Sequence, residues 1–154
     1  MSGHQAKVTY RVPYADTDRM GVVYYGNYLI YFEMARNQLL RDFGLPYVEL
    51  ERRGYALPVV EAHVQYRAAA GYDDELTILG WLGWARGVRL RVDCAVYCGD
   101  ALLAEGHTIH ACVERASFRP VKVLPELLER CTGETLAQGS SAPNRQAQIA
   151  NTGH

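Results

Sequence analysis

The chain has 154 residues, of which 49% are hydrophobic and 21% charged, and its formal net charge is -1 at pH 7. This length and composition are typical of one globular domain with its own core. The balanced charge gives the chain no overall attraction to nucleic acid or to an anionic membrane. No stretch approaches the roughly 18 uninterrupted apolar residues of a membrane span, so we expect no membrane insertion.

The first part of the chain predicts one strand and one long helix. Apolar residues alternate in KVTYRVP, residues 7–13, which indicates a strand that ends at Pro13. From Asn27 to Phe43 they recur at the three- and four-residue spacing of one helical face. Gly44 is suited to end this helix, and Pro46 prevents its continuation. The next segment, YVELERRG, is compatible with a short helix.

Four strand-like segments follow, separated by turn signals: LPVVEAHVQYRA, ELTILGWLGWA, VRLRVDCAVYC and ALLAEGHTIHACVER. Between residues 88 and 98, apolar and mostly polar side chains alternate, as in a strand with one face on the core. Hairpin connections exclude a doubly wound parallel sheet, so we predict an α+β fold with an antiparallel sheet on one long helix. We expect one domain over residues 1–131, including a short helix at 125–130, and a disordered tail over 132–154.

Cysteine and histidine spacing gives little support for a metal site. The four cysteines form no CxxC pair, and Cys94 and Cys98 share one strand parity, which favours small buried hydrophobes. We therefore expect a reducing, cytoplasmic setting. His107 and His110 have opposite strand parity, which weakens a metal-pair interpretation. We expect no metal ligands and no redox cofactor.

The segment YADTDRMGVVYYGNYLIYFEMAR, residues 14–36, carries the strongest chemical pattern. Asp16 and Asp18 precede Gly21 and the start of the long helix. Considered without the residues that follow, the two acids would be explained by a turn, because Asp and Thr favour turns. However, glycine permits backbone conformations that other residues resist, and a helix N-terminus carries about half a positive charge, which suits an oxyanion. A neighbouring carboxylate would serve as nucleophile or as base for water. The pattern indicates a compact acyl-transfer site.

The residues DTDRMGVVYYGNYLIYFEMAR resemble the hotdog-fold acyl-CoA thioesterases of the 4-hydroxybenzoyl-CoA thioesterase family, including the bacterial Tol-Pal-cluster thioesterases. The resemblance covers about residues 7–130, with support from YALPVVEAHVQYRAAAGYDDELTI and WARGVRLRV. It implies an antiparallel sheet wrapped around one long central helix and hydrolysis of an acyl-CoA to free acid and coenzyme A. It implies no cofactor beyond the coenzyme A of the substrate. It also implies a homodimer or homotetramer with the active site between protomers.

The resemblance assigns the catalytic role to the second acid of D-x-D, Asp18, and leaves Asp16 as a turn or support residue. It assigns the polarisation of the thioester carbonyl to the backbone N–H of Tyr25, where many members have His. Whether Asp18 attacks the thioester or activates water stays open. The expected substrate-binding residues around this motif are Gly21, Val23, Tyr24 and Tyr28, with the tyrosines suited to an aromatic or medium-sized acyl group.

Three residues farther along the chain complete the predicted set. Arg86 matches a family position that contacts the phosphates of coenzyme A, and Arg89 is an alternative for the same contact. Glu61 lies among apolar neighbours on the same strand parity as His63, so it is a secondary catalytic candidate that could reach the pocket across a subunit interface.

Two other classes of function remain as alternatives. The first is a non-catalytic module that binds acyl-CoA or an acyl carrier protein; the acid at Asp18 and the approach from Gly21 to Tyr25 argue against it. The second is a hotdog dehydratase, which would need a catalytic histidine that the motif region lacks.

Overall fold

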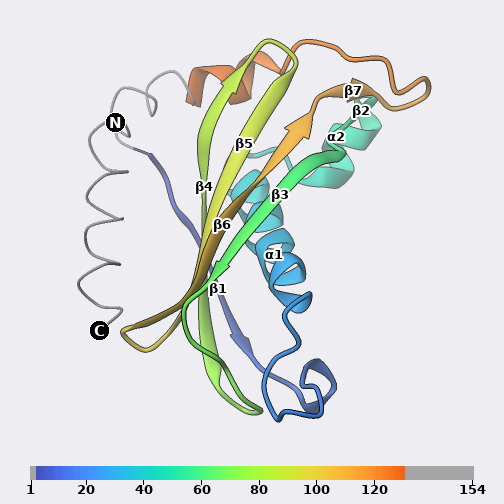
Figure 1. The fold of residues 1–154 in the computed structure, drawn as a ribbon. Coiled ribbons are helices and arrows are strands. Elements are labelled where there is room, and N and C mark those ends of the chain that lie inside the picture. Colours follow the sequence, from blue (N-terminus) through green and yellow to red (C-terminus); the bar gives the residue numbers. More distant parts are fainter. Residues whose placement is uncertain (1–2, 131–154) are drawn as a thin grey trace.

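The computed structural model describes residues 3–130 (Figure 1). Residue 131 and the predicted tail at 132–154 lie outside the described residues. The elements, in chain order, are β1 (Ala6–Arg11), a 3-10 turn (Tyr14–Asp16), α1 (Asn27–Asp42), α2 (Tyr47–Arg52), β2 (Tyr55–Ala56), β3 (Val59–Tyr66), β4 (Glu75–Arg86), β5 (Arg89–Cys98), β6 (Ala101–Ala111) and β7 (Val113–Glu114). Residues 125–130 are helical, as predicted.

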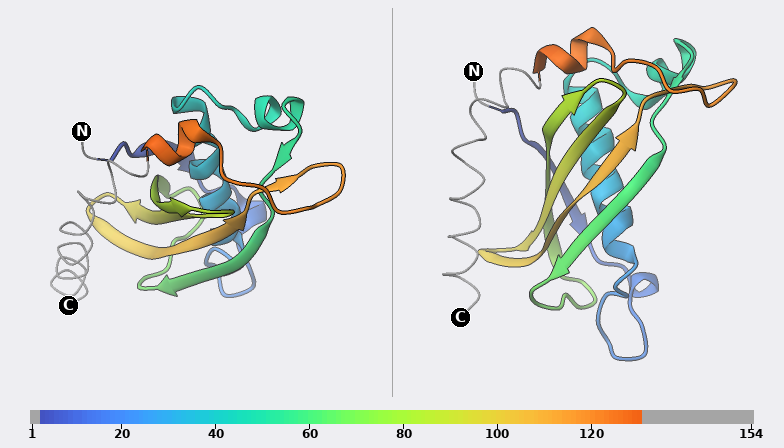
Figure 2. Two further views of the ribbon diagram at one scale, coloured as in Figure 1. Left: turned by 90° about the horizontal axis from the view of Figure 1, so that it is seen from above. Right: turned by 45° about the horizontal axis from the view of Figure 1, so that its top comes forward.

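The five long strands form one antiparallel sheet in the order β1-β4-β5-β6-β3, and α1 crosses one face of it (Figure 1). Seen from above, the sheet curves around α1 (Figure 2). The predicted strands and both predicted helices of the first half are thus confirmed. The last predicted strand divides, because after β6 the chain leaves the main sheet and β7 pairs with β2.

The helix and the sheet meet through small side chains. A Cβ added at Gly80 of β4 would lie only 3.0 Å from the Cβ of Ala35 on α1, so the close approach of helix and sheet depends on that glycine. On both sides of this contact α1 buries its apolar face, formed by Tyr28, Tyr31, Phe32, Ala35, Leu39 and Leu40. The facing residues of β5 are buried as its alternation predicts: Leu90, Val92, Cys94 and Val96.

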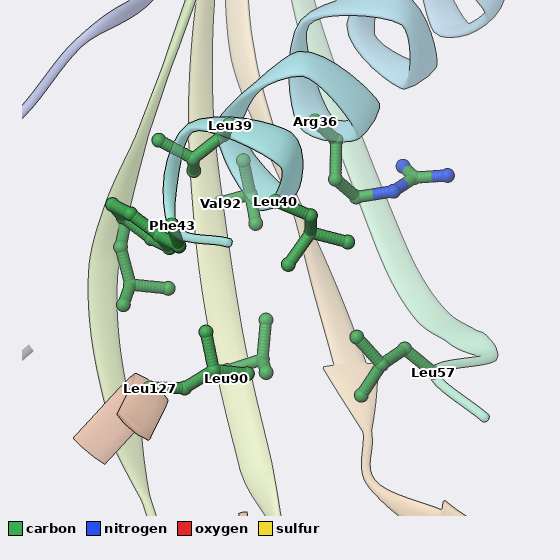
Figure 3. A pocket seen from close by; sticks show the side chains of 9 residues that line it. Arg36, Leu39, Leu40, Phe43, Leu57, Leu90, Val92 and Leu127 are labelled. Carbon is green, nitrogen blue, oxygen red and sulfur yellow. The ribbon is translucent and has the colours of Figure 1, made fainter. Parts of the chain in front are cut away.

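The last turns of α1 cover a small apolar hollow above the sheet (Figure 3). Leu39, Leu40 and Phe43 line it from the helix, and Leu127 and Leu90 lie across from them. The guanidinium of Arg36 points away from these apolar side chains (Figure 3). The hollow lies at the C-terminal end of α1, whereas the acidic loop lies at the N-terminal end of the same helix. We therefore assign the hollow to the hydrophobic core and not to the site at the acidic loop.

Strand β3 is the exposed edge of the sheet. Within the chain it pairs with β6 on one side, and all its residues are exposed except the half-buried Val64. An uncovered edge of eight residues offers unpaired backbone groups to another chain. None of the helices in the described part of the chain is long and apolar enough to cross a membrane.

Candidate functional site

The loop between β1 and α1 is a tight turn held against the segment that precedes β4. The N–H of Asp18 donates to the carbonyl of Val22 at 2.9 Å, and the N–H of Gly21 donates to the carbonyl of Asp18 at 2.9 Å. Gly21 has a φ of 81°, in the left-handed region that side chains disfavour, so the expected need for glycine here is confirmed. The N–H of Val23 then donates to the carbonyl of Ala70 at 2.8 Å, which anchors the loop.

Asp16 joins this loop to the core. One oxygen of its carboxylate, Oδ2, accepts the hydroxyls of Tyr10 and Tyr31, each at 2.8 Å. Its backbone carbonyl accepts the N–H of Tyr24 and the side-chain amide of Asn27, each at 2.9 Å. Burial, followed by the contact with Asp16, raises the pKa of Tyr10 to about 12 and raises the pKa of Tyr31 as well, so both hydroxyls remain donors. The structure places Asp16 where a support residue is expected.

Asp18 is partly exposed and keeps one carboxylate oxygen available. Its Oδ1 accepts the N–H of Met20 at 2.8 Å, while its Oδ2 accepts no hydrogen bond from the described residues. The pKa of Tyr24 is raised, mainly by its hydroxyl interaction with Tyr25 and to a smaller extent by the charge of Asp18. The charge of the Asp18 carboxylate therefore contributes to the environment of Tyr24.

The start of α1 presents two backbone N–H groups without an acceptor among the described residues, those of Tyr25 and Gly26. The carbonyl of Tyr24 accepts the N–H of Asn27 at 2.9 Å, and that of Tyr25 accepts the N–H of Tyr28 at 3.3 Å. No side chain in the described part of the chain caps the helix. Unpaired donors at a helix N-terminus form an anion-binding position, so this end of α1 is suited to hold a developing negative charge.

Aromatic rings surround this helix start. The rings of Tyr24 and Tyr25 are 4.7 Å apart, and Tyr66 of β3 packs on Tyr28 at 5.3 Å and on Tyr25 at 6.3 Å. Tyr24, Tyr25 and Tyr66 are 47%, 63% and 48% exposed. Tyr28, predicted to bind substrate, is buried beneath them. A Cβ at Gly26 would lie 2.8 Å from a ring carbon of Tyr24, so that ring folds closely over the helix start.

Tyr66 was absent from the residues predicted from sequence. A signal was available in its strand parity, because Tyr66 and the half-buried Val64 point to the same face of β3. That parity alone does not show that β3 passes the start of α1, which is a property of the tertiary fold.

The two predicted arginines lie far from the acidic loop in the same chain. Arg86 and Arg89 are opposite each other at the β4–β5 turn, and the guanidinium of Arg86 lies 4.7 Å above the ring of Trp84. The 12 residues of β4 extend over roughly 35–40 Å, and β4 begins at the end of the sheet where the acidic loop lies (Figure 1). One chain by itself does not bring these arginines to Asp18.

Glu61 and His63 share one face of β3, as predicted. His63 is paired with His107 of β6, and the carboxylate of Glu61 lies 3.7 Å from Nε2 of His107. The opposite face of β6 carries the buried His110 toward α1, so Glu61 points away from the helix. The structure does not bring Glu61 to Asp18 within one chain.

The two histidines of β6 occupy opposite faces, as their parity predicts. Burial, then the charge of Arg91, lowers the pKa of His107 on the outer face. Across residues 3–130, no group of three or more His, Cys, Asp or Glu side chains is arranged to hold a metal ion.

Comparison with known proteins shows the family to which the chain belongs. Residues 12–131 match the thioesterase-like superfamily. The acyl-CoA thioester hydrolase YbgC of Escherichia coli O6:H1 is 33% identical over 117 residues, which cover 75% of this chain and 87% of that protein.

Two solved structures share the architecture. The DHNA-CoA thioesterase of Staphylococcus aureus superposes with a TM-score of 0.81 at 24% identity, covering 89% of this chain and 95% of that one. The protein TT1821 of Thermus thermophilus gives 0.77 at 32% identity, covering 83% and 98%. These likenesses confirm the predicted hotdog fold. The match over residues 12–131 and the 33% identity to the E. coli protein establish that the chain belongs to the thioesterase-like superfamily.

Proposed function

We propose that this protein hydrolyses acyl-CoA thioesters, releasing a free carboxylic acid and coenzyme A. The observation that carries the proposal is that one short loop holds both Asp18, whose Oδ2 has no hydrogen-bond donor among the described residues, and a helix start whose N–H groups at Tyr25 and Gly26 have no acceptor there. Family membership and the activity named for the E. coli relative support the same reaction.

In this reaction the thioester carbonyl oxygen accepts a hydrogen bond from the N–H of Tyr25, with the N–H of Gly26 beside it. These donors stabilise the negative charge that develops on the oxygen when the carbonyl carbon is attacked. In one route Asp18 attacks the carbon, the C–S bond breaks, coenzyme A leaves as thiolate, and water hydrolyses the resulting anhydride. In the other route Asp18 takes a proton from the attacking water. Both routes use the same groups.

Substrate binding in this proposal needs a second copy of the chain. If the exposed β3 edges of two protomers pair antiparallel, the sheet continues across a two-fold axis and its unpaired backbone groups are satisfied. The axis reverses the strand direction, so the β4–β5 turn of the partner comes to the end of the molecule where Asp18 lies. Arg86 and Arg89 would then contact coenzyme A phosphates from the partner. Glu61 would act only across such an interface.

The exposed tyrosines at Tyr24 and Tyr25 suit an aromatic or medium-sized acyl group, which would lie along the turn between Gly21 and Val23, with Tyr28 beneath it. An acyl carrier protein thioester offers the same reacting bond. The proposal also includes a reducing, cytoplasmic location, which the cysteine pattern leads us to expect. A module that binds acyl-CoA without hydrolysis remains the alternative.

The experiment is a thiol-release assay with benzoyl-, phenylacetyl-, naphthoyl- and fatty acyl-CoA. Because Asn at position 18 can still accept the N–H of Met20, Asp18→Asn should fold like the parent. We expect it to lower kcat at least about 100-fold, as loss of an acid–base or nucleophilic group does. Asp73→Asn, at an exposed carboxylate near the same loop, is the matched control and should retain parent activity.

Undiminished turnover by Asp18→Asn would remove Asp18 from the reaction. If the parent hydrolyses none of these thioesters while binding them, the non-catalytic module is the better assignment.

A further inference from the structure

The hydroxyl of Tyr66 donates a hydrogen bond to the backbone carbonyl of Tyr25 at 2.9 Å, across 41 residues of sequence. This carbonyl belongs to the same peptide unit as the N–H of Gly26, one of the two free donors at the start of α1. The contact joins the last residue of β3 to the candidate oxyanion site.

A hydrogen bond to a carbonyl controls the N–H on the other side of the peptide. Because the peptide unit is planar, fixing the carbonyl of Tyr25 fixes the direction of the N–H of Gly26. Consecutive hydrogen bonds also polarise one another, so a donor on the carbonyl strengthens the N–H as a donor. The hydroxyl of Tyr66 acts on the N–H of Gly26 in both ways.

The neighbouring peptide is fixed by the backbone alone. The carbonyl of Tyr24, in the same peptide unit as the N–H of Tyr25, accepts the N–H of Asn27 at 2.9 Å. For the carbonyl of Tyr25 the corresponding backbone contact, from the N–H of Tyr28, is longer at 3.3 Å. The orientation of the Gly26 N–H therefore depends on a side chain, whereas that of the Tyr25 N–H does not.

The surroundings of Tyr66 keep it in place as a donor. Its ring makes edge contacts with Tyr28 at 5.3 Å and with Tyr25 at 6.3 Å. Burial, then the nearby Tyr25, raises its pKa, so the hydroxyl keeps its proton at neutral pH.

We propose that Tyr66 is a positioning residue that orients and strengthens the Tyr25–Gly26 peptide as an oxyanion donor. The proposal rests on the thioesterase function proposed above. It assigns Tyr66 an effect on the transition state, where charge on the oxygen is greatest, and little effect on the binding of the rest of the substrate.

The test compares Tyr66→Phe, which deletes one hydroxyl, with Tyr72→Phe, which deletes the hydroxyl of a neighbouring exposed tyrosine whose ring packs on Tyr14. We expect Tyr66→Phe to lower kcat about 3- to 10-fold, the range of one hydrogen bond, with KM unchanged within twofold. Tyr72→Phe should match the parent in both.

A second measurement uses two unreactive ligands of equal length, phenacyl-CoA, which keeps a carbonyl oxygen, and phenethyl-CoA, which lacks it. We expect Tyr66→Phe to weaken phenacyl-CoA binding severalfold and to leave phenethyl-CoA binding unchanged. In Tyr66→Phe, the infrared carbonyl band of bound phenacyl-CoA should lie closer to its frequency in water than it does in the parent.

Equal weakening of both ligands, or parent kcat in Tyr66→Phe, would overturn the positioning role. Failure of the parent to hydrolyse any thioester counts against the proposed function, whereas the ligand pair still decides the role of Tyr66.

Discussion

His110 offers a direct test of how burial couples this fold to pH. It is fully buried in β6, where Nδ1 lies 2.8 Å from the carbonyl of Leu57 and Nε2 lies 2.8 Å from the hydroxyl of Thr108. A carbonyl can only accept, so Nδ1 carries the proton and Nε2 accepts from Thr108. The ring is therefore neutral and both its nitrogens are paired.

Burial lowers the pKa of His110 from 6.5 to about 4. Above pH 6.5 the ring is neutral in both the folded and the unfolded chain, and its full contribution to stability is present. As the pH falls from 6.5 toward 4, the unfolded chain takes up the proton more readily, so stability is lost. At about 1.4 kcal/mol per pKa unit, this loss reaches about 3 kcal/mol near pH 4.

The assay is urea unfolding between pH 7.5 and 4 for the parent and for His110→Gln. A glutamine amide can donate to Leu57 and accept from Thr108 without titrating. Carboxylates contribute equally to both proteins, so the parent should lose about 3 kcal/mol more than His110→Gln over this range. Parallel pH profiles for parent and His110→Gln would refute the reasoning.

Two further predictions concern the site and the subunit interface. Asp16→Ala removes the acceptor shared by Tyr10 and Tyr31, and at about 1–3 kcal/mol per stranded donor the free energy of unfolding should fall by about 3 kcal/mol; an unchanged urea midpoint would contradict the support role. The exposed β3 edge predicts that the parent sediments as a dimer and that the Val60→Lys variant sediments as a monomer and loses activity. A parent that is both monomeric and active would exclude a site shared between two protomers.

Local patterns in the sequence were sufficient for most of the architecture. The periodic burial of α1 and of β5 follows from residues within each element, so spacing alone located both. The two-residue strand β2 was missed, because a piece this short has no periodicity. Strand β7 was predicted only as the end of one continuous strand, and the break after β6 was not foreseen.

The loop chemistry was predictable only where it is local. Gly21 takes the left-handed conformation that the tight turn requires, and the carboxylate of Asp18 precedes the helix start as the motif indicated. The contacts of Asp16 and Tyr66 were not predictable, because they join the loop to β1 and β3 across the fold.

The sequence by itself determined the long elements, the left-handed turn at Gly21 and the position of an acid shortly before a helix start, since each depends on neighbours along the chain. Only the tertiary structure decided which side chains hold that turn, since Tyr10, Tyr31 and Tyr66 reach it through sheet and helix packing. The same packing placed Arg86 at the opposite end of β4 and turned Glu61 to the outer face, because strand direction and register fix where a side chain lies.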